Sequence, residues 1–427
     1  MFQSHDGLMN AVRNRFAHIE ECPFEGTRVF FENAGGALTL KTVVDTSAKF
    51  AAIPDNQGRD NVASKELMKI IAKAKADTML FLNAKEGQVF VGESGTELLF
   101  RMISNAILAA PGGGNVVGTT LEHPASRSAA QRWAKEAGKP YLAVSHNDAT
   151  GSVDAEDYAS VVTPETRVAT IIHTSPVTGM GVDVAGISKT IRSISPDCII
   201  IVDGIQHAAH GDIDIDAYNI DGYAISPYKV FSRHGYGIAW ISDRLSAMPH
   251  DSLIDGPEGN WELGTRDTGA YATLSDVVEY FEWLGSHFTD SEDRREKLIA
   301  AGVAIHGQEK SLTDAMLYGT GNLKGLADMP EVEIIGGTNN PRREGLVALN
   351  VTGLDALDVV EKLNKAGIRV HVRKADHYSG NVLSPLGLPS CVRVSMCHYN
   401  SEHEVAQFLA AMRDITGEVS AAPTGQL

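Results

Sequence analysis

The 427-residue sequence has few cysteines and no long apolar run, and each absence excludes a class of protein. Its cysteines are too few and too scattered for a disulfide framework, and no Cys-x-x-Cys pair occurs. This usage is typical of the reducing cytoplasm. The longest apolar stretches, such as CIIIV at 198–202, are far shorter than the ~20 residues that a transmembrane helix requires. The charged N-terminus lacks an apolar segment, so we expect no signal peptide.

Basic residues are outnumbered by acidic ones, 37 against 54, which gives a formal net charge of −17. Such a surface repels phosphates, so we expect neither nucleic acid nor an anionic membrane as a partner. The hydrophobic share of 43% is that of an ordinary globular protein. A local pocket can still differ from the mean charge, and we expect a small molecule as the partner.

Common nucleotide, zinc-protease and serine-hydrolase motifs are also absent. The segment PGGGN at 111–115 lies after a predicted helix and before a predicted strand, so we interpret it as a turn and not as an anion site. His207 and His210 have no third ligand at a suitable spacing. We therefore expect no metal site.

Apolar segments of strand length alternate with helical patterns through most of the chain, which predicts an α/β protein with a mainly parallel sheet. The predicted strands are 115–121, 140–145, 167–173, 198–203, 222–226 and 237–242. The predicted helices are 96–110, 124–137, 185–194 and 272–287.

The charge-rich segment at 290–297 suggests a domain boundary. We expect an N-terminal segment at 1–25, a large domain at 26–287, a smaller α+β domain at 288–418 and a frayed tail at 419–427. In the smaller domain, the predicted strands are 332–336, 345–351, 368–373 and 391–396, and the predicted helices are 354–366 and 401–415, after a long helix near residue 298.

The most informative residues follow two of the predicted strands. Asp203 ends a buried strand, with Gln206 close behind, and the carboxyl end of such a strand faces the crevice where α/β proteins bind ligands. An alternative is a helix N-cap. Lys229 lies in SPYKVFSRHGYG at 226–237, between two predicted strands, and the alternative there is a solvated loop lysine.

Two further segments are expected at the same edge of the sheet. In GESGTELL at 92–99, small residues precede a helix, whose free N–H groups and dipole favour an anion; the alternative is simple helix capping. Glu122 and His123 directly follow the predicted strand at 115–121.

Taken in this order, together with FFENAGG at 30–36, WELGT at 261–265 and RVSMCHYNSEHEV at 393–405, the motifs resemble the pyridoxal-phosphate enzymes of the class V aminotransferase and cysteine desulfurase group. The resemblance covers nearly the whole chain. It implies an aspartate-aminotransferase-like fold of type I, pyridoxal 5'-phosphate as cofactor, and a homodimer with composite active sites.

The resemblance also implies roles for individual residues. Lys229 would hold the cofactor covalently and move protons at the substrate Cα, Asp203 would pair with the pyridine nitrogen, and His123 would stack on the ring. The remaining cofactor contacts would come from Gly95, Thr96, Gln206, Ser226, Tyr228 and, from the other subunit, Thr265. Substrate would be bound by Arg393, which takes the α-carboxylate, and by Asn33, Gly35, His377 and Tyr378.

Three departures from the family pattern limit this resemblance. Tyr228 replaces the usual histidine before the lysine, and Pro176 replaces a frequent asparagine. The loop in which desulfurases have a nucleophilic cysteine has none here, at 377–379. Cys391 shares a predicted strand with Arg393, where a small buried residue is the more natural interpretation. Desulfuration through a persulfide needs a thiolate and is therefore disfavoured.

We expect a lyase in which Lys229 removes the α-proton and a β-substituent is eliminated, with His377 or Tyr378 as the acid. An aminotransferase, an epimerase, a cysteine desulfurase or selenocysteine lyase, and a non-catalytic binding protein remain as alternatives. Arg369, His371 and Arg373 alternate on one predicted strand and would share a face, as a second anion contact or as a solvated edge.

Overall fold

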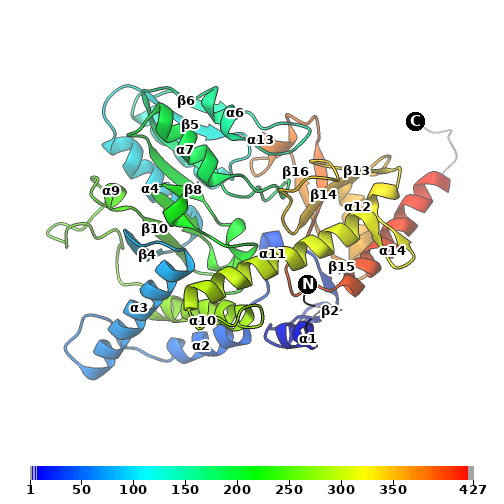
Figure 1. The fold of residues 1–427 in the computed structure, drawn as a ribbon, viewed down its shortest axis with the longest axis horizontal. Helices are drawn as coiled ribbons and strands as arrows, with labels where there is room; N and C mark the ends of the chain where they lie inside the picture. Colours follow the sequence, from blue (N-terminus) through cyan, green and yellow to red (C-terminus); the bar gives the residue numbers. More distant parts are fainter. Residues whose placement is uncertain (1, 3–4, 6, 422–427) are drawn as a thin grey trace.

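The computed structural model describes residues 2, 5 and 7–421 (Figure 1). The tail expected at 419–427 lies outside the described residues from 422 onward, and the last helix, α14 (Glu402–Ala421), includes its first residues. Among the described residues, no helix is both long enough and apolar enough to cross a membrane.

The centre of the molecule is a seven-stranded sheet in the order β4-β10-β9-β8-β7-β5-β6. Its strands are β4 (Gln88–Gly92), β5 (Asn115–Thr119), β6 (Tyr141–Val144), β7 (Thr166–Ile172), β8 (Ile199–Asp203), β9 (Gly222–Ile225) and β10 (Gly237–Ile241). The strands from β6 to β9 pair in parallel, whereas β10 runs antiparallel to both of its neighbours. The mainly parallel α/β fold is thus confirmed, and β4 is an additional strand that the sequence pattern did not reveal.

Alternate residues of each strand serve opposite faces of the sheet, which explains the nearly continuous apolar runs. Ile199 and Ile201 pack under α4 (Gly95–Ala109) and α5 (Pro124–Glu136), whereas Ile200 and Val202 pack under helices of the other face. That other face is covered by α3 (Val62–Phe81), α7 (Val184–Ile194) and α10 (Thr268–Gly285). The sheet is therefore buried on both sides, and its strand ends are the places open to a ligand.

The C-terminal part begins with the long helix α11 (Arg294–Tyr318) and contains an antiparallel sheet in the order β13-β14-β17-β16. Its elements are β13 (Val332–Ile334), β14 (Leu346–Val351), α12 (Ala356–Lys365), β16 (His371–Lys374) and β17 (Ser390–Ser395). This part has an apolar cluster of its own, to which α14 contributes Phe408 and Met412.

The single strand predicted at 368–373 is wrong. Residues Ile368–Arg369 form β15, which pairs in parallel with β3 (Val29–Phe30), whereas His371–Lys374 form β16 and pair with β17. The chain changes partner at the buried Val370, because the N-terminal strand competes for the first half of the segment. Arg369 consequently leaves the face that His371 and Arg373 share.

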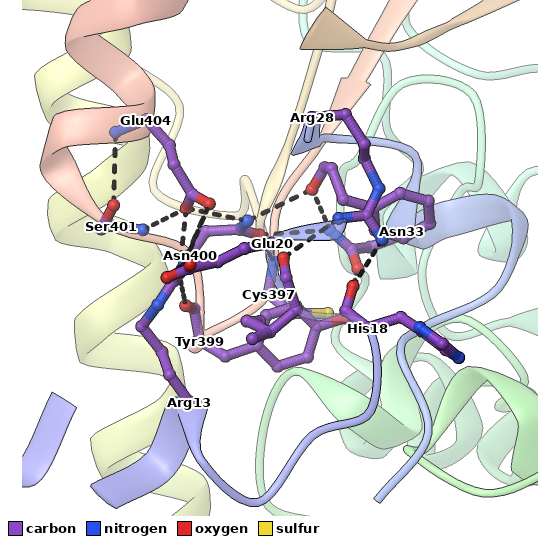
Figure 2. Close-up of polar contacts among 12 residues, drawn as sticks. Arg13, His18, Glu20, Arg28, Asn33, Cys397, Tyr399, Asn400, Ser401 and Glu404 are labelled. Atoms are coloured by element: carbon purple, nitrogen blue, oxygen red, sulfur yellow. Dashed lines mark hydrogen bonds and ion pairs between the residues drawn. The ribbon is translucent and has the colours of Figure 1, made fainter. Parts of the chain in front are cut away.

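The FFENAGG and HYN segments are hydrogen-bonded to each other in the interior, although more than 360 residues separate them in the sequence (Figure 2). The Asn33 amide donates to Asn400 Oδ1 at 3.2 Å and to the Ser395 carbonyl at 2.9 Å, and it accepts from the Tyr399 hydroxyl. Arg13 adds an ion pair with Glu404 at 3.4 Å. These contacts fix the N-terminal segment beside β17.

Short elements complete the fold. They are α1 (Leu8–Arg13), α2 (Lys41–Ala51), α6 (Ala155–Ala159), α8 (Ile215–Tyr218), α9 (Asp243–Ser246), α13 (Gly380–Leu383), β1 (Glu21–Cys22), β2 (Gly26–Thr27), β11 (Gly319–Thr320) and β12 (Leu323–Lys324), with 3-10 turns at Asn33–Gly35, His207–Ala209, Pro227–Lys229 and Leu326–Asp328.

Candidate active site

A small cavity lies at the carboxyl ends of β8 and β9. Because these two strands are parallel neighbours, the residues that follow them meet at one edge of the sheet. The structure brings together most of the residues predicted to bind the cofactor, and those that line the cavity are Thr96, His123, Asp203, Gln206, Ser226, Tyr228 and Lys229.

Lys229 is the central amine of this cavity, and its Nζ donates to Gln206 Oε1 at 3.2 Å. Burial, reinforced by the Arg393 cation, lowers the pKa of Lys229 to about 7. A large share of the amine is therefore uncharged at neutral pH, the form that attacks a carbonyl. The solvated loop lysine that we weighed as an alternative does not fit this environment.

Asp203 lies at the end of β8 and is almost completely buried. Its Oδ1 accepts a hydrogen bond from the Ile205 amide at 3.1 Å. Burial raises the pKa of Asp203 to about 6, although this amide and Lys229 act in the opposite direction. A buried carboxyl with spare acceptor capacity is suited to pair with a ligand N–H.

His123 is the N-cap of α5, where its Nδ1 accepts from the Ala125 amide at 3.2 Å. Burial, together with Lys229, lowers the pKa of His123 to about 3. The imidazole is therefore neutral, and the bond at Nδ1 leaves the proton on Nε2. A neutral ring beside the cavity can stack on a planar ligand.

The N-terminus of α4 opens onto Ser226 at one side of the cavity. Ser94 caps this helix by accepting from the Glu97 amide at 3.1 Å, so capping and the proposed anion site coexist. A Cβ at Gly95 would lie 2.4 Å from Ser226 Oγ and 2.6 Å from the Ile205 side chain. Only glycine lets Ser226 and Ile205 pack this closely against the helix N-terminus, where N–H groups and the dipole favour an anion.

Tyr228 and Pro176, the two residues that depart from the family pattern, both line the cavity. The Tyr228 ring stacks on His234 with centroids 4.3 Å apart, and burial raises the pKa of its hydroxyl. Pro176 also lines the cavity, and its carbonyl accepts from Arg393 Nη1 at 3.1 Å. The proline thus binds a neighbouring arginine through its backbone instead of offering a side-chain amide.

Arg393 is buried in β17, behind Pro176. Its Nη2 would lie 3.5 Å from a Cβ placed at Gly35, so Gly35 borders this guanidinium. Burial, together with Arg373, lowers the pKa of Arg393 to about 10. Its role as the carboxylate ligand stays a prediction, as does that of Asn33, whose amide is occupied by bonds to Asn400 and Tyr399.

The loop before β17 is docked onto the connection that precedes α5. The Asn381 amide donates to the carbonyls of Thr120 and Glu122 at 2.7 and 2.9 Å, and Arg127 donates to the His377 carbonyl at 3.3 Å. The side chains of His377 and Tyr378 are exposed and do not line the cavity. Their predicted contact with substrate stays a prediction.

All four cysteines are buried and free. Burial raises the pKa of Cys391 to about 12, so its thiol remains protonated at neutral pH. Thr265 is exposed and lies outside the cavity, beside a surface hollow with Asp267 and Phe50. That Thr265 contacts the cofactor of a partner subunit stays a prediction.

Sequence reasoning missed the residues that stand behind Gln206. Gln206 Nε2 lies 3.2 Å from His210 Nε2, and His207 Nδ1 lies 2.6 Å from Glu344 Oε1. His210 Nδ1 in turn bonds to Glu309, and the polar atoms of His210, Glu309 and Cys397 lie within 4.8 Å of one another. No local signal links Gln206 to α11, because this contact depends on the tertiary fold.

Comparisons with known proteins agree with this geometry. The chain is 26% identical over 408 residues to "Cysteine desulfurase-like protein ustD" of Aspergillus flavus. The aligned region covers 91% of this chain and 88% of the relative. It is 24% identical to "Aminotransferase-like protein FGM3" of Gibberella zeae, over 94% of this chain and 96% of the relative. "Cysteine desulfurase" of Cronobacter sakazakii is 24% identical, over 90% and 92%.

Solved structures show the same fold. The cysteine desulfurase CsdA of Escherichia coli matches with a TM-score of 0.76 at 22% identity, over 96% of this chain and 98% of that chain. The enzyme of Thermococcus onnurineus also has a TM-score of 0.76, over 92% and 95%. The family model "Aminotransferase class-V" matches residues 29–408. The chain therefore belongs to the class V aminotransferase family, a family of pyridoxal-phosphate-dependent enzymes with the type I fold.

Proposed function

We propose that the chain is a pyridoxal-phosphate-dependent lyase that acts on an amino acid. The observation that carries the proposal is the Lys229 amine, with a pKa of about 7, facing a cavity that offers a buried carboxyl and no thiol. An uncharged lysine in this position can take a proton from the substrate Cα and return it. Without a nucleophilic thiol, the remaining chemistry favours release of a β-substituent.

The residues present fit pyridoxal 5'-phosphate. When bound, this cofactor supplies an electron sink for the negative charge that develops at Cα. Asp203 would accept from the pyridine N–H, His123 would cover one face of the ring, and Gln206 would bond to the ring oxygen. The N-terminus of α4 would take the phosphate, with the Ser226 hydroxyl, which packs against Gly95, as a further donor.

Each residue then has a task in the reaction. Arg393 would bind and orient the α-carboxylate through a two-pronged contact, which places Cα near Lys229 Nζ. Lys229 would hold the cofactor and move the proton at Cα. His377 and Tyr378 are the residues proposed to protonate the leaving group, from the docked loop. Thr265 would complete the phosphate site of the other subunit of a homodimer.

The alternatives within the family differ in their products. The relatives of the chain include both an aminotransferase-like protein and a cysteine desulfurase. An aminotransferase would stop in the amine form of the cofactor until a keto acid is added, and an epimerase would exchange the Cα proton for solvent deuterium without net product. Desulfuration is disfavoured because Cys391, the thiol on the same strand as Arg393, has its pKa raised to about 12 by burial and stays protonated.

The test is a panel of β-substituted amino acids offered to the holoenzyme, with products identified by mass spectrometry. We expect catalytic release of ammonia and an α-keto acid without an added amino acceptor, and no turnover by Lys229→Ala. Stoichiometric conversion that needs a keto acid would favour the aminotransferase. Sulfide release that is lost in Cys391→Ala would favour the desulfurase. A chain that takes up no cofactor and turns over no substrate, with or without Lys229, would favour a binding protein.

A further inference from the structure

The buried side-chain amide of Gln206 is held at both ends. Its Oε1 accepts a hydrogen bond from Lys229 Nζ at 3.2 Å, and its Nε2 lies 3.2 Å from His210 Nε2. An amide nitrogen only donates, so His210 Nε2 is the acceptor, and the ring carries its proton on Nδ1, 2.8 Å from Glu309 Oε2. In this arrangement the amide end that faces the cavity lysine is the oxygen, which has no proton to give.

The proposed cofactor requires the opposite end of this amide. In pyridoxal phosphate the ring hydroxyl is bonded to the carbon next to the one that bears the aldehyde. When the aldehyde meets Lys229 Nζ, the ring oxygen therefore comes close to the group that Nζ contacts, which is Gln206 Oε1. An ionised ring oxygen only accepts, as does Oε1, whereas Nε2 can donate to it. Gln206 would therefore exchange its two ends when the cofactor binds.

The exchange of ends changes what His210 must carry. With Gln206 Oε1 turned toward it, His210 Nε2 faces an acceptor and needs a proton of its own. Nδ1 still faces Glu309, so the His210–Glu309 pair then holds one proton more than before. This count is the same for an imidazolium beside a carboxylate and for a neutral ring beside a carboxylic acid. Turning the amide and adding the proton are thus one event.

The charges around His210 favour that added proton. Burial alone would lower the pKa of His210, but Glu309 and Glu344 outweigh burial, so the pKa is raised. Lys229 acts in the opposite direction, so the loss of its ammonium charge favours the proton on His210. The titratable groups that face His210 from the elements packed against it are Glu309 on α11, Glu344 before β14, His207 on the same turn, Lys229 after β9, and Cys397 and His398 before α14.

The remaining neighbours of His210 do not compete for this proton. His207 is paired with Glu344 at 2.6 Å, so its charge is balanced locally. Burial raises the pKa of the Cys397 thiol, which stays neutral. Burial lowers the pKa of His398 to about 3, so this imidazole is neutral as well. The carboxylate that can answer a second proton on His210 is therefore Glu309, the group already bonded to it.

We propose that the His210–Glu309 pair is a proton-controlled positioning device for Gln206. With its single proton on Nδ1, His210 holds the amide oxygen toward Lys229; with a second proton taken from water, it holds the amide N–H toward the ring oxygen of the cofactor. Only hydrogen bonds and one bound proton change. The inference rests on the proposed function for its cofactor and adds His210 as a positioning residue that acts through Gln206.

The test is the protonation of His210 Nε2, read from the nitrogen NMR spectrum of the chain with isotope-labelled histidines. Ring nitrogens with and without a proton differ widely in chemical shift, and His210→Gln assigns the signal by its loss. We expect Nε2 to lack a proton in the apo chain near neutral pH and to carry one after loading with pyridoxal phosphate. In loaded Gln206→Leu, which has no amide to turn, Nε2 should stay as in the apo chain.

Cofactor affinity separates positioning from a structural role. His210→Gln supplies an amide that can accept from or donate to Gln206, so the Kd of pyridoxal phosphate should stay within about 3-fold of the wild-type value. His210→Phe can do neither, and the Kd should rise at least about 10-fold, since a hydrogen bond to a charged group contributes roughly 1.5–3 kcal/mol. His306→Gln, exposed on the same helix as Glu309, is the control and should bind like the wild type.

The outcomes distinguish the device from the cofactor site on which it rests. A loaded wild type in which His210 Nε2 has no proton would overturn the inference. So would a proton that appears on loading in Gln206→Leu as it does in the wild type, because the amide would then have no part in it. If the wild-type chain takes up no pyridoxal phosphate at all, the proposed function itself fails, and the inference fails with it.

Discussion

His210 Nδ1 lies 2.8 Å from Glu309 Oε2 in the interior of the protein, where α11 meets the turn after β8. The opposite ring nitrogen faces the amide nitrogen of Gln206 at 3.2 Å. An amide nitrogen only donates, so His210 Nε2 accepts and the ring proton is on Nδ1, directed at Glu309. This relay points Gln206 Oε1 at Lys229 and sets which end of the amide faces the cavity.

Glu309→Ala should strongly destabilise the fold, because it leaves His210 buried without its partner. We expect the free energy of unfolding to fall by about 3–5 kcal/mol, as for other buried pairs that lose one member. Urea denaturation of the variant measures it. Asp314→Ala removes an exposed ion pair with Lys310 from the same helix and should cost no more than about 1 kcal/mol. Equal losses in the free energy of unfolding for the two substitutions would show that the Glu309–His210 contact does not stabilise the fold.

The pKa of Lys229 predicts how the apo chain captures its cofactor. The neutral amine is the nucleophile, and its fraction rises with pH through about 7 instead of through the ordinary value near 10.4. The rate of absorbance change on mixing with pyridoxal phosphate should therefore rise with pH and level off about one unit above 7.

The Arg393 cation contributes to this low value, so Arg393→Gln should move the midpoint to higher pH. Arg369→Gln removes a cation that lies on another sheet and should leave the midpoint in place. A rate that keeps increasing up to pH 10 in the wild type would contradict the assignment of the low pKa to Lys229.

Gly95→Ala tests the phosphate cradle. Its Cβ would meet Ser226 Oγ at 2.4 Å and so displace this hydroxyl from the N-terminus of α4. Loss of this donor to a charged phosphate costs roughly 1.5–3 kcal/mol, which corresponds to a loss of about 10–150-fold in affinity for pyridoxal phosphate. Pyridoxal, which has no phosphate, should lose much less. Gly112→Ala, in the turn at 111–115, meets no atom within 4 Å and serves as the control.

The parallel sheet and the meeting of Asp203 with Lys229 were predictable because both depend on local patterns. Continuous apolar strands imply a sheet covered on both faces, and the carboxyl ends of its parallel strands share one edge. The strand at 368–373 could not be predicted correctly, because its first half pairs with residues 29–30, which lie far away in the sequence. Long-range partners of this kind override local strand propensity.

Long-range partners also explain why the contacts of Arg373, Glu309 and Asn33 could not be predicted from the sequence. Arg373 was one of three alternating basic residues in the sequence, and only the exchange of partners at Val370 separates it from Arg369. Glu309 lies in a helix with nothing in its pattern to connect it to His210. Asn33 was expected to touch the substrate, but the hydrogen bonds of its amide go to Asn400, Tyr399 and nearby carbonyls.

Thr265 predicts that a complete phosphate site needs two chains. Within one chain Thr265 is exposed and does not line the cavity. If it serves the partner subunit, Thr265→Ala should weaken cofactor binding about 10-fold, the value of one hydrogen bond to a charged group. Borohydride reduction, which fixes the cofactor onto Lys229, followed by mass spectrometry of each chain, measures the loading.

Hybrid dimers make this prediction specific. A dimer of one Lys229→Ala chain and one Thr265→Ala chain has one site without either group and one site with both, since the intact Thr265 comes from the chain that lacks the lysine. Label should therefore reach the Thr265→Ala chain of the hybrid at the wild-type cofactor affinity, although the same chain binds weakly as a homodimer. If co-assembly leaves that affinity at the homodimer value, each Thr265 acts only within its own chain, and the composite site is wrong.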